Sequence, residues 1–289
     1  MQSVASLLTS EVSKPTSEVG LIATLRSYGS AAVALSGGVD SAVVAKAAFL
    51  ALGTNAVAVT ADSPGVARVD FEDAKRIAAV IGIRHVIVKT SEFESPDYAR
   101  NDGSRCYYCK SELYSQIETL LPSLGVNVIC SGANLDDLGD YRPGLIAAAE
   151  HYVKHPLQEA AFSKTMVREL AKAWDLPVWD KPASPCLSSR IAPGVAATAE
   201  RTRRVENAEA YLKSLGLSNV RVRCHEGELA RIEVAIADIV KLADLRSDVT
   251  THLQSLGFKF VTLDLAGFRS GSLNELIPLE IKQRLTLSR

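Results

Sequence analysis

The sequence predicts an α/β fold: a doubly wound parallel sheet, followed by a smaller C-terminal α+β domain. In the first half, short apolar runs alternate with segments of helical spacing, as in βαβ units. A Pro- and Ser-containing stretch without a regular period, residues 176–195, separates the two halves. After it come a helix, two alternating strands, a helix and a last strand. We therefore expect domains at residues 1–195 and 196–289.

The expected strands of the first half are short and almost wholly apolar, which indicates burial on both faces of a parallel sheet. Right-handed crossovers then place helices on either side. The ends of the strands at the carboxyl side are the expected ligand site. The strands are expected at residues 31–36, 56–63, 85–90 and 126–134, and the helices between them at 40–53 and 72–82.

In the second half, an amphipathic helix at 199–216 is closed by Gly216. Residues 219–225 and 229–235 alternate as strands around the turn residues EGE. The last expected elements are a helix at 237–257 and a strand at 259–267. This order predicts a small α+β domain of roughly ninety residues.

Composition excludes several classes of protein. The 289 residues carry 32 Lys and Arg against 33 Asp and Glu, which argues against coating of nucleic acid. No apolar run is long enough to span a membrane, and residues 1–20 lack the pattern of a secretory signal. The odd number of cysteines, five, argues against a disulfide scaffold. We expect a cytoplasmic protein whose thiols are free for metal or sulfur chemistry.

A glycine turn, LSGGVDS at residues 35–41, lies between the first expected strand and helix. Its glycines let the backbone turn tightly, and the helix N-terminus that follows suits a phosphate group. Asp40 can cap that helix or hold Mg²⁺. An ordinary strand–turn–helix joint would also explain two glycines. The candidate nucleotide-binding residues are Ser36, Gly37, Gly38, Asp40 and Ser41.

Cys106 and Cys109 have the CxxC spacing that lets two sulfurs face one centre, as in zinc and iron–sulfur sites. A single CxxC also suits a redox pair or two buried thiols. If Cys186 folds over the same cleft, the three thiolates would leave a cluster with one open iron. Lys181 and Arg190 flank Cys186, where cations would favour a thiolate unless they bind solvent or carboxylates instead. The other two cysteines are expected to be structural: Cys130 and Cys224.

The string SGGVDS resembles the PP-loop of the ATP pyrophosphatases, which differs from the Walker loop in lacking GK[ST]. The resemblance implies a fold of the adenine nucleotide alpha hydrolase type. It also implies that ATP adenylates a carbonyl or carboxylate oxygen while pyrophosphate leaves. ADSPG at 61–65, with Asp62, sits where those enzymes contact the adenosine.

Six strings occur in an order that resembles the LarE family of ATP-dependent sulfur transferases, over about residues 18–277: SGGVDS, RCYYCK, SGANLDDLGDYRPG, PLQEAAFSKTMVREL, WDKPASPCLSSRI and FVTLDLAGFRSGSLNE. The resemblance implies a role in assembling the nickel-pincer nucleotide cofactor of lactate racemase and related enzymes. The implied substrate is pyridinium-3,5-biscarboxylic acid mononucleotide. One of its carboxylates is adenylated with ATP·Mg²⁺, and sulfur then displaces AMP to give a thiocarboxylate. Family members form homo-oligomers, which we expect here too.

Two sulfur sources are known in that family. In one form, the cysteine at the position of Cys186 surrenders its sulfur and becomes dehydroalanine. In the other, three cysteines hold a 4Fe-4S cluster that carries an extra sulfide. Because this chain has Cys106, Cys109 and Cys186, we predict the cluster form over sacrificial use of Cys186.

Further polar residues are candidates for nucleotide or substrate contacts. Asp136, Asp137 and Asp140 follow a strand end and can hold Mg²⁺ or a ribose, or form a solvated turn; we take Asp137 with Asp40 as the Mg²⁺ ligands. Guanidinium groups match phosphate and carboxylate geometry, although a salt-bridge ladder would also place arginines on a strand. The candidates for the substrate are Arg142, Lys181, Arg190, Arg221 and Arg223, with Glu233 on the same strand face, and those for pyrophosphate are Lys164 and Arg168.

Three other functions remain open. A tRNA thiolase of the same superfamily would need a basic RNA-binding surface, and a pI near 6.5 counts against one. An amide-forming synthetase would leave the cysteines unexplained. A nucleotide-sensing module would bind ATP without turnover. We expect a small nucleotide as the partner, and neither nucleic acid nor a membrane.

Overall fold

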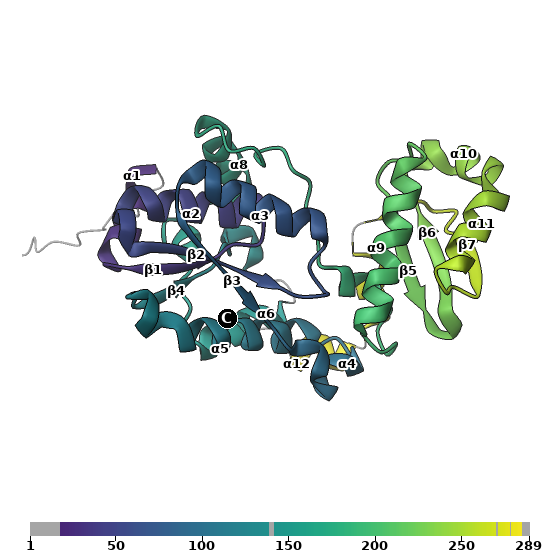
Figure 1. The fold of residues 1–289 in the computed structure, drawn as a ribbon, viewed down its shortest axis with the longest axis horizontal. Coiled ribbons are helices and arrows are strands. Elements are labelled where there is room, and N and C mark those ends of the chain that lie inside the picture. Colours follow the sequence, from purple (N-terminus) through teal and green to yellow (C-terminus); the bar gives the residue numbers. More distant parts are fainter. Residues whose placement is uncertain (1–17, 139–141, 270, 278, 285–289) are drawn as a thin grey trace, which may run out of the picture.

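The computed structural model describes residues 18–138, 142–269, 271–277 and 279–284. Asp140 and residues 1–17 lie outside this part of the chain. Two sheets organise the described residues (Figure 1). The first has four parallel strands in the order β3-β2-β1-β4, and the second has three strands in the order β5-β6-β7. The predicted α/β fold with a parallel sheet is therefore confirmed.

The strands of the first sheet are β1 (Ala31–Ala34), β2 (Ala56–Asp62), β3 (Arg84–Lys89) and β4 (Val128–Cys130). Alternate residues of β1 and β2 enter different cores. Ala31 and Val33 belong to one buried cluster, whereas Ala32 and Ala34 belong to another on the opposite face. Both faces are thus buried, which explains why these strands read as continuous apolar runs.

Helices cover both faces of this sheet, as Figure 1 shows. The core on one face is built with α1, α2, α3 and α8, and the core on the other with α5 and α6. The bounds of the helices are α1 (Glu18–Ser27), α2 (Val39–Leu52), α3 (Arg68–Ile81), α4 (Pro96–Arg100), α5 (Arg105–Leu124), α6 (Pro143–Glu150), α7 (Pro156–Glu159) and α8 (Lys164–Ala173). The short 3₁₀ helices are η1 (Gly53–Asn55), η2 (Glu92–Glu94), η3 (Leu135–Asp137) and η4 (Leu187–Arg190).

The second sheet has its own core. Strand β5 (Arg221–His225) pairs antiparallel with β6 (Leu229–Glu233), and β6 pairs parallel with β7 (Phe260–Leu263). Apolar residues of one sheet face pack with α9 (Ala199–Ser214), α10 (Ile239–Asp244) and α11 (Arg246–Ser255). The remaining elements are η5 (Glu226–Glu228), η6 (Ile236–Asp238), η7 (Ser272–Leu276) and α12 (Leu279–Arg284).

Two features differ from the expected elements. The helix expected at 237–257 is divided into α10 and α11, and Leu245 is the single residue between them. The helix α5, which carries RCYYCK, is not among the expected elements, and only Leu113, Tyr114 and Ile117 are buried in it.

The second core also includes residues from the first half of the chain. Tyr98 of α4 and Ile191, after η4, pack among the residues of α9 and β5. The backbone of Ala192 donates a hydrogen bond to the carbonyl oxygen of Cys224 at 2.9 Å. The segments that carry the cysteines therefore lie where the two cores meet.

Candidate active site

The glycine turn between β1 and α2 folds around the hydroxyl group of Ser41. Its oxygen accepts a hydrogen bond from the backbone N–H of Ser36 at 3.1 Å and lies 3.1 Å from the hydroxyl oxygen of Ser36. The Ser41 hydroxyl also donates to the carbonyl oxygen of Gly38 at 3.1 Å. The loop is therefore preorganised at the N-terminus of α2, whose first N–H groups suit an anion.

Two glycines allow close approaches of backbone to this loop. Gly37 has a φ of 77°, and a Cβ atom there would lie 2.3 Å from the carbonyl oxygen of Asp70 in α3. A Cβ atom on Gly132, after β4, would lie 2.8 Å from the backbone nitrogen of Ser41. The sequence reasoning did not single out Gly132, because only the tertiary structure brings the end of β4 against the loop.

Asp40 and Asp137 meet at one corner beside the loop. The side-chain amide of Asn134 donates to Oδ1 of Asp40 at 3.0 Å, and its backbone N–H donates to Oδ2 of Asp137 at 2.9 Å. The ammonium group of Lys164 forms an ion pair with Asp40, and Arg142 forms one with Asp137 at 2.9 Å. Two carboxylates at one corner suit Mg²⁺, which commonly binds one or two of them together with substrate phosphates. Asp136 lies outside this pair and accepts from the backbone N–H of Lys164 at 3.0 Å.

Asp62 lies at the carboxyl end of β2, in the wall of an open pocket of about 340 Å³. Its carboxylate forms an ion pair with Arg68 at 2.8 Å. Lys89 and Thr90, at the end of β3, line the same pocket. The pocket lies at the carboxyl ends of parallel strands, where ligands bind in folds of this class.

Lys181 connects the glycine loop to the segment before Cys186. Its Nζ atom donates to the carbonyl oxygen of Gly37 at 3.0 Å and forms ion pairs with Asp70 at 2.7 Å and Asp73 at 2.6 Å. Burial works against its positive charge, but hydrogen bonds to both carboxylates prevail and raise the pKa of Lys181. Lys181 therefore braces the glycine loop, and its role in substrate binding stays a prediction. Arg168 braces the same segment through the carbonyl oxygens of Trp179 and Lys181, both at 2.9 Å.

The structure brings Cys106, Cys109 and Cys186 together. The first two lie in the first turns of α5, and Cys186 directly precedes η4. Burial first, and the negative charge of a deprotonated Cys186 among the further causes, raises the pKa of Cys106 and of Cys109. By contrast, Cys130 and Cys224 are fully buried in the two cores.

Hydrogen bonds hold the two cysteine-bearing segments against each other. The buried amide of Asn101, between α4 and α5, donates to the carbonyl oxygens of Ala192 and Val195, both at 2.9 Å. Asn101 has a φ of 52°, a left-handed conformation that asparagine tolerates. The backbone of Leu187, next to Cys186, donates to the carbonyl oxygen of Gly65 at 2.8 Å. Cys186 thus lies between α5 and the loop that follows β2.

Two cations next to the CxxC cysteines along α5, Arg105 and Lys110, interact electrostatically with these thiols. The sequence analysis selected Lys181 and Arg190 because they flank Cys186. The cations directly next to Cys106 and Cys109 in RCYYCK were the better signal. Burial raises the pKa of Cys106, and the positive charges of Arg105 and Lys110 act in the opposite direction. The guanidinium group of Arg190 contacts the backbone of Cys186 and a carboxylate. It donates to the carbonyl oxygen of Cys186 at 2.9 Å and to Glu209 at 3.2 Å.

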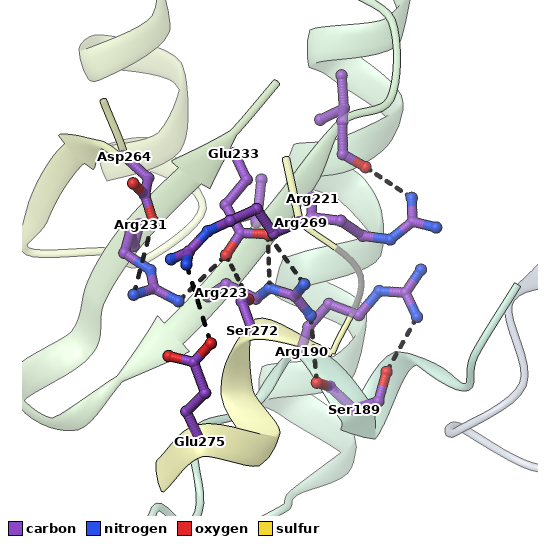
Figure 2. Close-up of polar contacts among 12 residues, drawn as sticks. Ser189, Arg190, Arg221, Arg223, Arg231, Glu233, Asp264, Arg269, Ser272 and Glu275 are labelled. Carbon is purple, nitrogen blue, oxygen red and sulfur yellow. Dashed lines mark hydrogen bonds and ion pairs between the residues drawn. The ribbon is translucent and has the colours of Figure 1, made fainter. Parts of the chain in front are cut away.

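Three arginines converge at the junction of the two cores (Figure 2). Arg223 is buried and donates to Oε2 of Glu233 at 2.9 and 3.1 Å. Arg221 makes a hydrogen bond to the carbonyl oxygen of Val220 at 2.8 Å and lies over the ring of Phe268. Burial, followed by the positive charges of Arg190 and Arg223, lowers the pKa of Arg221. An anion placed among these guanidinium groups would relieve their mutual repulsion.

Among the described residues, no set of three or more His, Cys, Asp and Glu side chains is arranged around a single metal ion. None of their helices combines the length and the apolar character that crossing a membrane requires.

Comparison with known proteins agrees with this geometry. The NAD synthase family matches residues 20–99, which include the glycine loop. An uncharacterised protein of Synechocystis sp. is 48% identical over 250 residues, covering 86% of this chain and 92% of that protein. Pyridinium-3,5-bisthiocarboxylic acid mononucleotide synthase of Lactiplantibacillus plantarum is 39% identical over 264 residues, covering 91% and 95%. An uncharacterised protein of Methanocaldococcus jannaschii is 25% identical over 238 residues, covering 82% and 90%.

The synthase of Lactiplantibacillus plantarum matches nearly the whole chain, and an identity of 39% over that length shows that the two proteins belong to one family. The glycine loop, the doubly covered parallel sheet and the RCYYCK and PASPCLSSR segments are all in the described structure. The expected resemblance is confirmed, and the chain belongs to the LarE family of PP-loop enzymes.

Proposed function

We propose that this enzyme activates a carboxylate of pyridinium-3,5-biscarboxylic acid mononucleotide with ATP and converts it to a thiocarboxylate. The observation that carries the proposal is the meeting of three free thiols beside the loops of a nucleotide-binding fold. The relative from Lactiplantibacillus plantarum bears the name of a synthase for the corresponding bisthiocarboxylate.

ATP would bind with its phosphates at the glycine loop. The N–H groups at the start of α2 and the hydroxyl groups of Ser36 and Ser41 are the donors there. Mg²⁺ would be held by Asp40 and Asp137, which requires Lys164 to turn from Asp40 toward the pyrophosphate. Asp62 lines the pocket in which we place the adenosine.

The chemistry follows from the poor reactivity of a carboxylate toward nucleophiles. A carboxylate oxygen attacks the α-phosphorus of ATP, pyrophosphate leaves, and an acyl adenylate forms. A sulfur nucleophile then attacks the acyl carbon, the carbon–oxygen bond to AMP breaks, and any proton on sulfur passes to solvent. No electron is transferred in either step.

The donor set fits a 4Fe-4S cluster with one open iron. A cluster binds each thiolate through a different iron, so its ligands lie further apart than those of one ion. This separation is consistent with three mutually interacting thiols that do not form a single-ion site. When bound, the cluster would supply an iron that carries an exchangeable sulfide; Cys106, Cys109 and Cys186 would hold it.

The substrate phosphate would bind among Arg190, Arg221 and Arg223. Of these, Arg221 has no carboxylate within ion-pair distance among the described residues. Its location at the junction fits our division into a PP-loop domain, residues 1–195, and a smaller domain, residues 196–289, that closes over the cleft. A homo-oligomer remains part of this proposal, with a neighbouring subunit covering the same cleft.

The test is anaerobic incubation of the iron-reconstituted protein with ATP, Mg²⁺ and the dicarboxylate, followed by mass spectrometry. We expect pyrophosphate, AMP and a thiocarboxylate, with several turnovers when sulfide is supplied. A single turnover with loss of one sulfur from Cys186 would contradict the cluster and support sacrificial use of that cysteine. Adenylation of no acid at all would contradict the whole proposal, and retention of tRNA that depends on salt would favour a tRNA thiolase.

A further inference from the structure

Two cations beside the three thiols lack a carboxylate partner. Neither Arg105 nor Lys110 forms an ion pair with any Asp or Glu among the described residues. Most other cations near the site are paired, as Lys181 is with Asp70 and Asp73. A partly buried cation without a counter-ion is costly, which indicates that an anion completes this site in use.

The tertiary structure holds both side chains in place. Arg105 donates to the side-chain oxygen of Asn101, the residue that clamps the segment following Cys186. The stem of Lys110 passes close to Gly144 of α6, where an added Cβ would lie 3.0 Å from its Cγ atom. Its ammonium group lies 5.8 Å from the centre of the Tyr114 ring. Both cations are therefore half-buried and packed against other parts of the chain.

The thiols are among the negative groups that act on both cations. Burial opposes the charge of Arg105, but the negative charges of Cys186 and Cys106 prevail and raise its pKa. The pKa of Lys110 is raised first by Tyr114, against burial, and then by the three thiols. One carboxylate, Glu92, acts on Cys109 from the other side and is hydrogen bonded to Ser63.

The charge of the two cations indicates the kind of ligand that fits. Two cations without a carboxylate partner favour an anionic ligand over a neutral one. Hydrosulfide is a small anion that carries the sulfur that the proposed reaction consumes, whereas a neutral sulfur source would gain nothing from these charges.

We propose that Arg105 and Lys110 form an anion-binding site beside the three cysteines that collects hydrosulfide, the sulfur source of the reaction. The proposal rests on the sulfur-transfer function proposed above. The binding is ionic: hydrosulfide approaches as an anion, no bond in it breaks, and no oxidant is needed. Arg105 and Lys110 thereby select a charged sulfur donor over a neutral thiol.

The first experiment uses the full chain without iron, so that it is independent of any cluster. The thiols are modified with 5,5′-dithiobis(2-nitrobenzoate), which carries two negative charges, and with neutral 4,4′-dithiodipyridine. Rates at Cys106, Cys109 and Cys186 are followed by peptide mass spectrometry. The same thiolate attacks a disulfide sulfur of either reagent and displaces the other half as a thiolate or thione. The ratio of the two rates therefore cancels any change in thiolate fraction and reports the electrostatic potential at the thiol.

We expect the ratio of anionic to neutral reagent to fall roughly fivefold in Arg105→Gln or Lys110→Gln, and further in the double variant. The wild-type ratio should also fall as salt is raised. Arg105→Lys keeps the charge and should keep the ratio, which separates loss of charge from loss of the Asn101 contact. Arg100→Gln, at a surface pair with Asp97, is the matched control. A ratio in the Gln variants equal to that of Arg100→Gln would overturn the proposal.

The second experiment measures hydrosulfide itself on the iron-reconstituted protein. Labile sulfide beyond that of the cluster is titrated at constant iron content. We expect half-saturation at a several-fold higher hydrosulfide concentration in the Gln variants, and an unchanged affinity would overturn the proposal. If the wild-type chain takes up no cluster, the cluster form of the proposed function fails, and the reagent ratio alone decides whether the anion site exists.

Discussion

The hydroxyl group of Tyr98 lies 2.7 Å from the hydroxyl oxygen of Ser188, and both side chains are buried. Tyr98 belongs to α4, which precedes the helix that carries Cys106 and Cys109. Ser188 belongs to η4, which follows Cys186. One hydrogen bond thus joins the two segments that supply the thiols.

Tyr98→Phe removes this hydrogen bond and leaves the buried Ser188 hydroxyl without its partner. We expect a loss of roughly 1 kcal/mol in the free energy of unfolding, because a buried polar group loses its partner. Cross-linking of Cys186 to Cys106 or Cys109 by dibromobimane should fall as well. Tyr107→Phe is the control, since the Tyr107 hydroxyl bonds to Glu150 at an exposed position. Equal cross-linking in both variants would show that the Tyr98 bond does not position the thiols.

Gly37→Ala should impair both folding and nucleotide binding. The new Cβ would lie 2.3 Å from the carbonyl oxygen of Asp70, and φ is 77°. Gly29→Ala is matched in backbone conformation, with φ of 75°, but its Cβ would meet nothing within 4 Å. Urea unfolding should show a loss of roughly 1 kcal/mol in Gly29→Ala from the left-handed conformation alone, and a clearly larger loss in Gly37→Ala. Similar losses would mean that α3 yields readily to the loop.

Lys181→Ala leaves Asp70 and Asp73 without their shared cation. Since all three side chains are largely buried, we expect a loss of roughly 2–4 kcal/mol in the free energy of unfolding. Calorimetric titration with ATP·Mg²⁺ should also show weaker binding, because the Gly37 carbonyl loses its donor. Lys75→Ala, at an exposed pair with Glu72 on the same helix, should change neither quantity. ATP binding as tight as in the wild type would exclude Lys181 as a brace of the loop.

Arg221 and Arg223 should respond differently to the same substitution. Arg223→Gln leaves the fully buried carboxylate of Glu233 to Arg231 and Ser272 alone, so stability should fall by roughly 2 kcal/mol. Arg221→Gln breaks no ion pair and should remain within about 1 kcal/mol of the wild type. If the substrate phosphate binds here, KM for the dicarboxylate should rise roughly tenfold or more in Arg221→Gln. An unchanged KM would remove Arg221 from the substrate site.

Glu228 makes stability depend on pH in the acid range. Hydrogen bonding to Arg201 at 2.5 Å, against burial, lowers the pKa of this carboxyl, and Arg204 contributes from the other side. A depressed pKa in the folded state stabilises the protein above the unfolded value of about 4.5 and ceases to do so as the pH falls through the folded value. Wild type should therefore exceed Glu228→Gln by roughly 1–2 kcal/mol at pH 7, and the difference should shrink below pH 4.5. The exposed neighbour Glu226 serves as the control through Glu226→Gln.

The parallel sheet could be predicted from the sequence because its strands are buried on both faces. The expected strand at 56–63 and the observed β2 (Ala56–Asp62) nearly coincide, since Val and Ala fill every position of the strand except Thr60 and Asp62. The glycine loop was equally predictable, because only glycine fits the left-handed turn at Gly37. The division at Leu245 was not, since both α10 and α11 keep helical spacing across it.

The sequence by itself determined the fold class, the family and which three cysteines are the candidates for sulfur chemistry. It could do so because the spacing of motifs and the apolar character of strands depend on residues that are close together along the chain. Only the tertiary structure decided which cations serve those sulfurs. Lys181 and Arg190 are near Cys186 along the chain. In the structure, however, Lys181 forms ion pairs with Asp70 and Asp73, and Arg190 forms one with Glu209. Arg105 and Lys110 of α5 act on Cys186 because Tyr98 and Asn101, which precede α5, are hydrogen bonded to the segment that follows Cys186. Electrostatic interactions depend on distance in space, and long-range packing sets that distance.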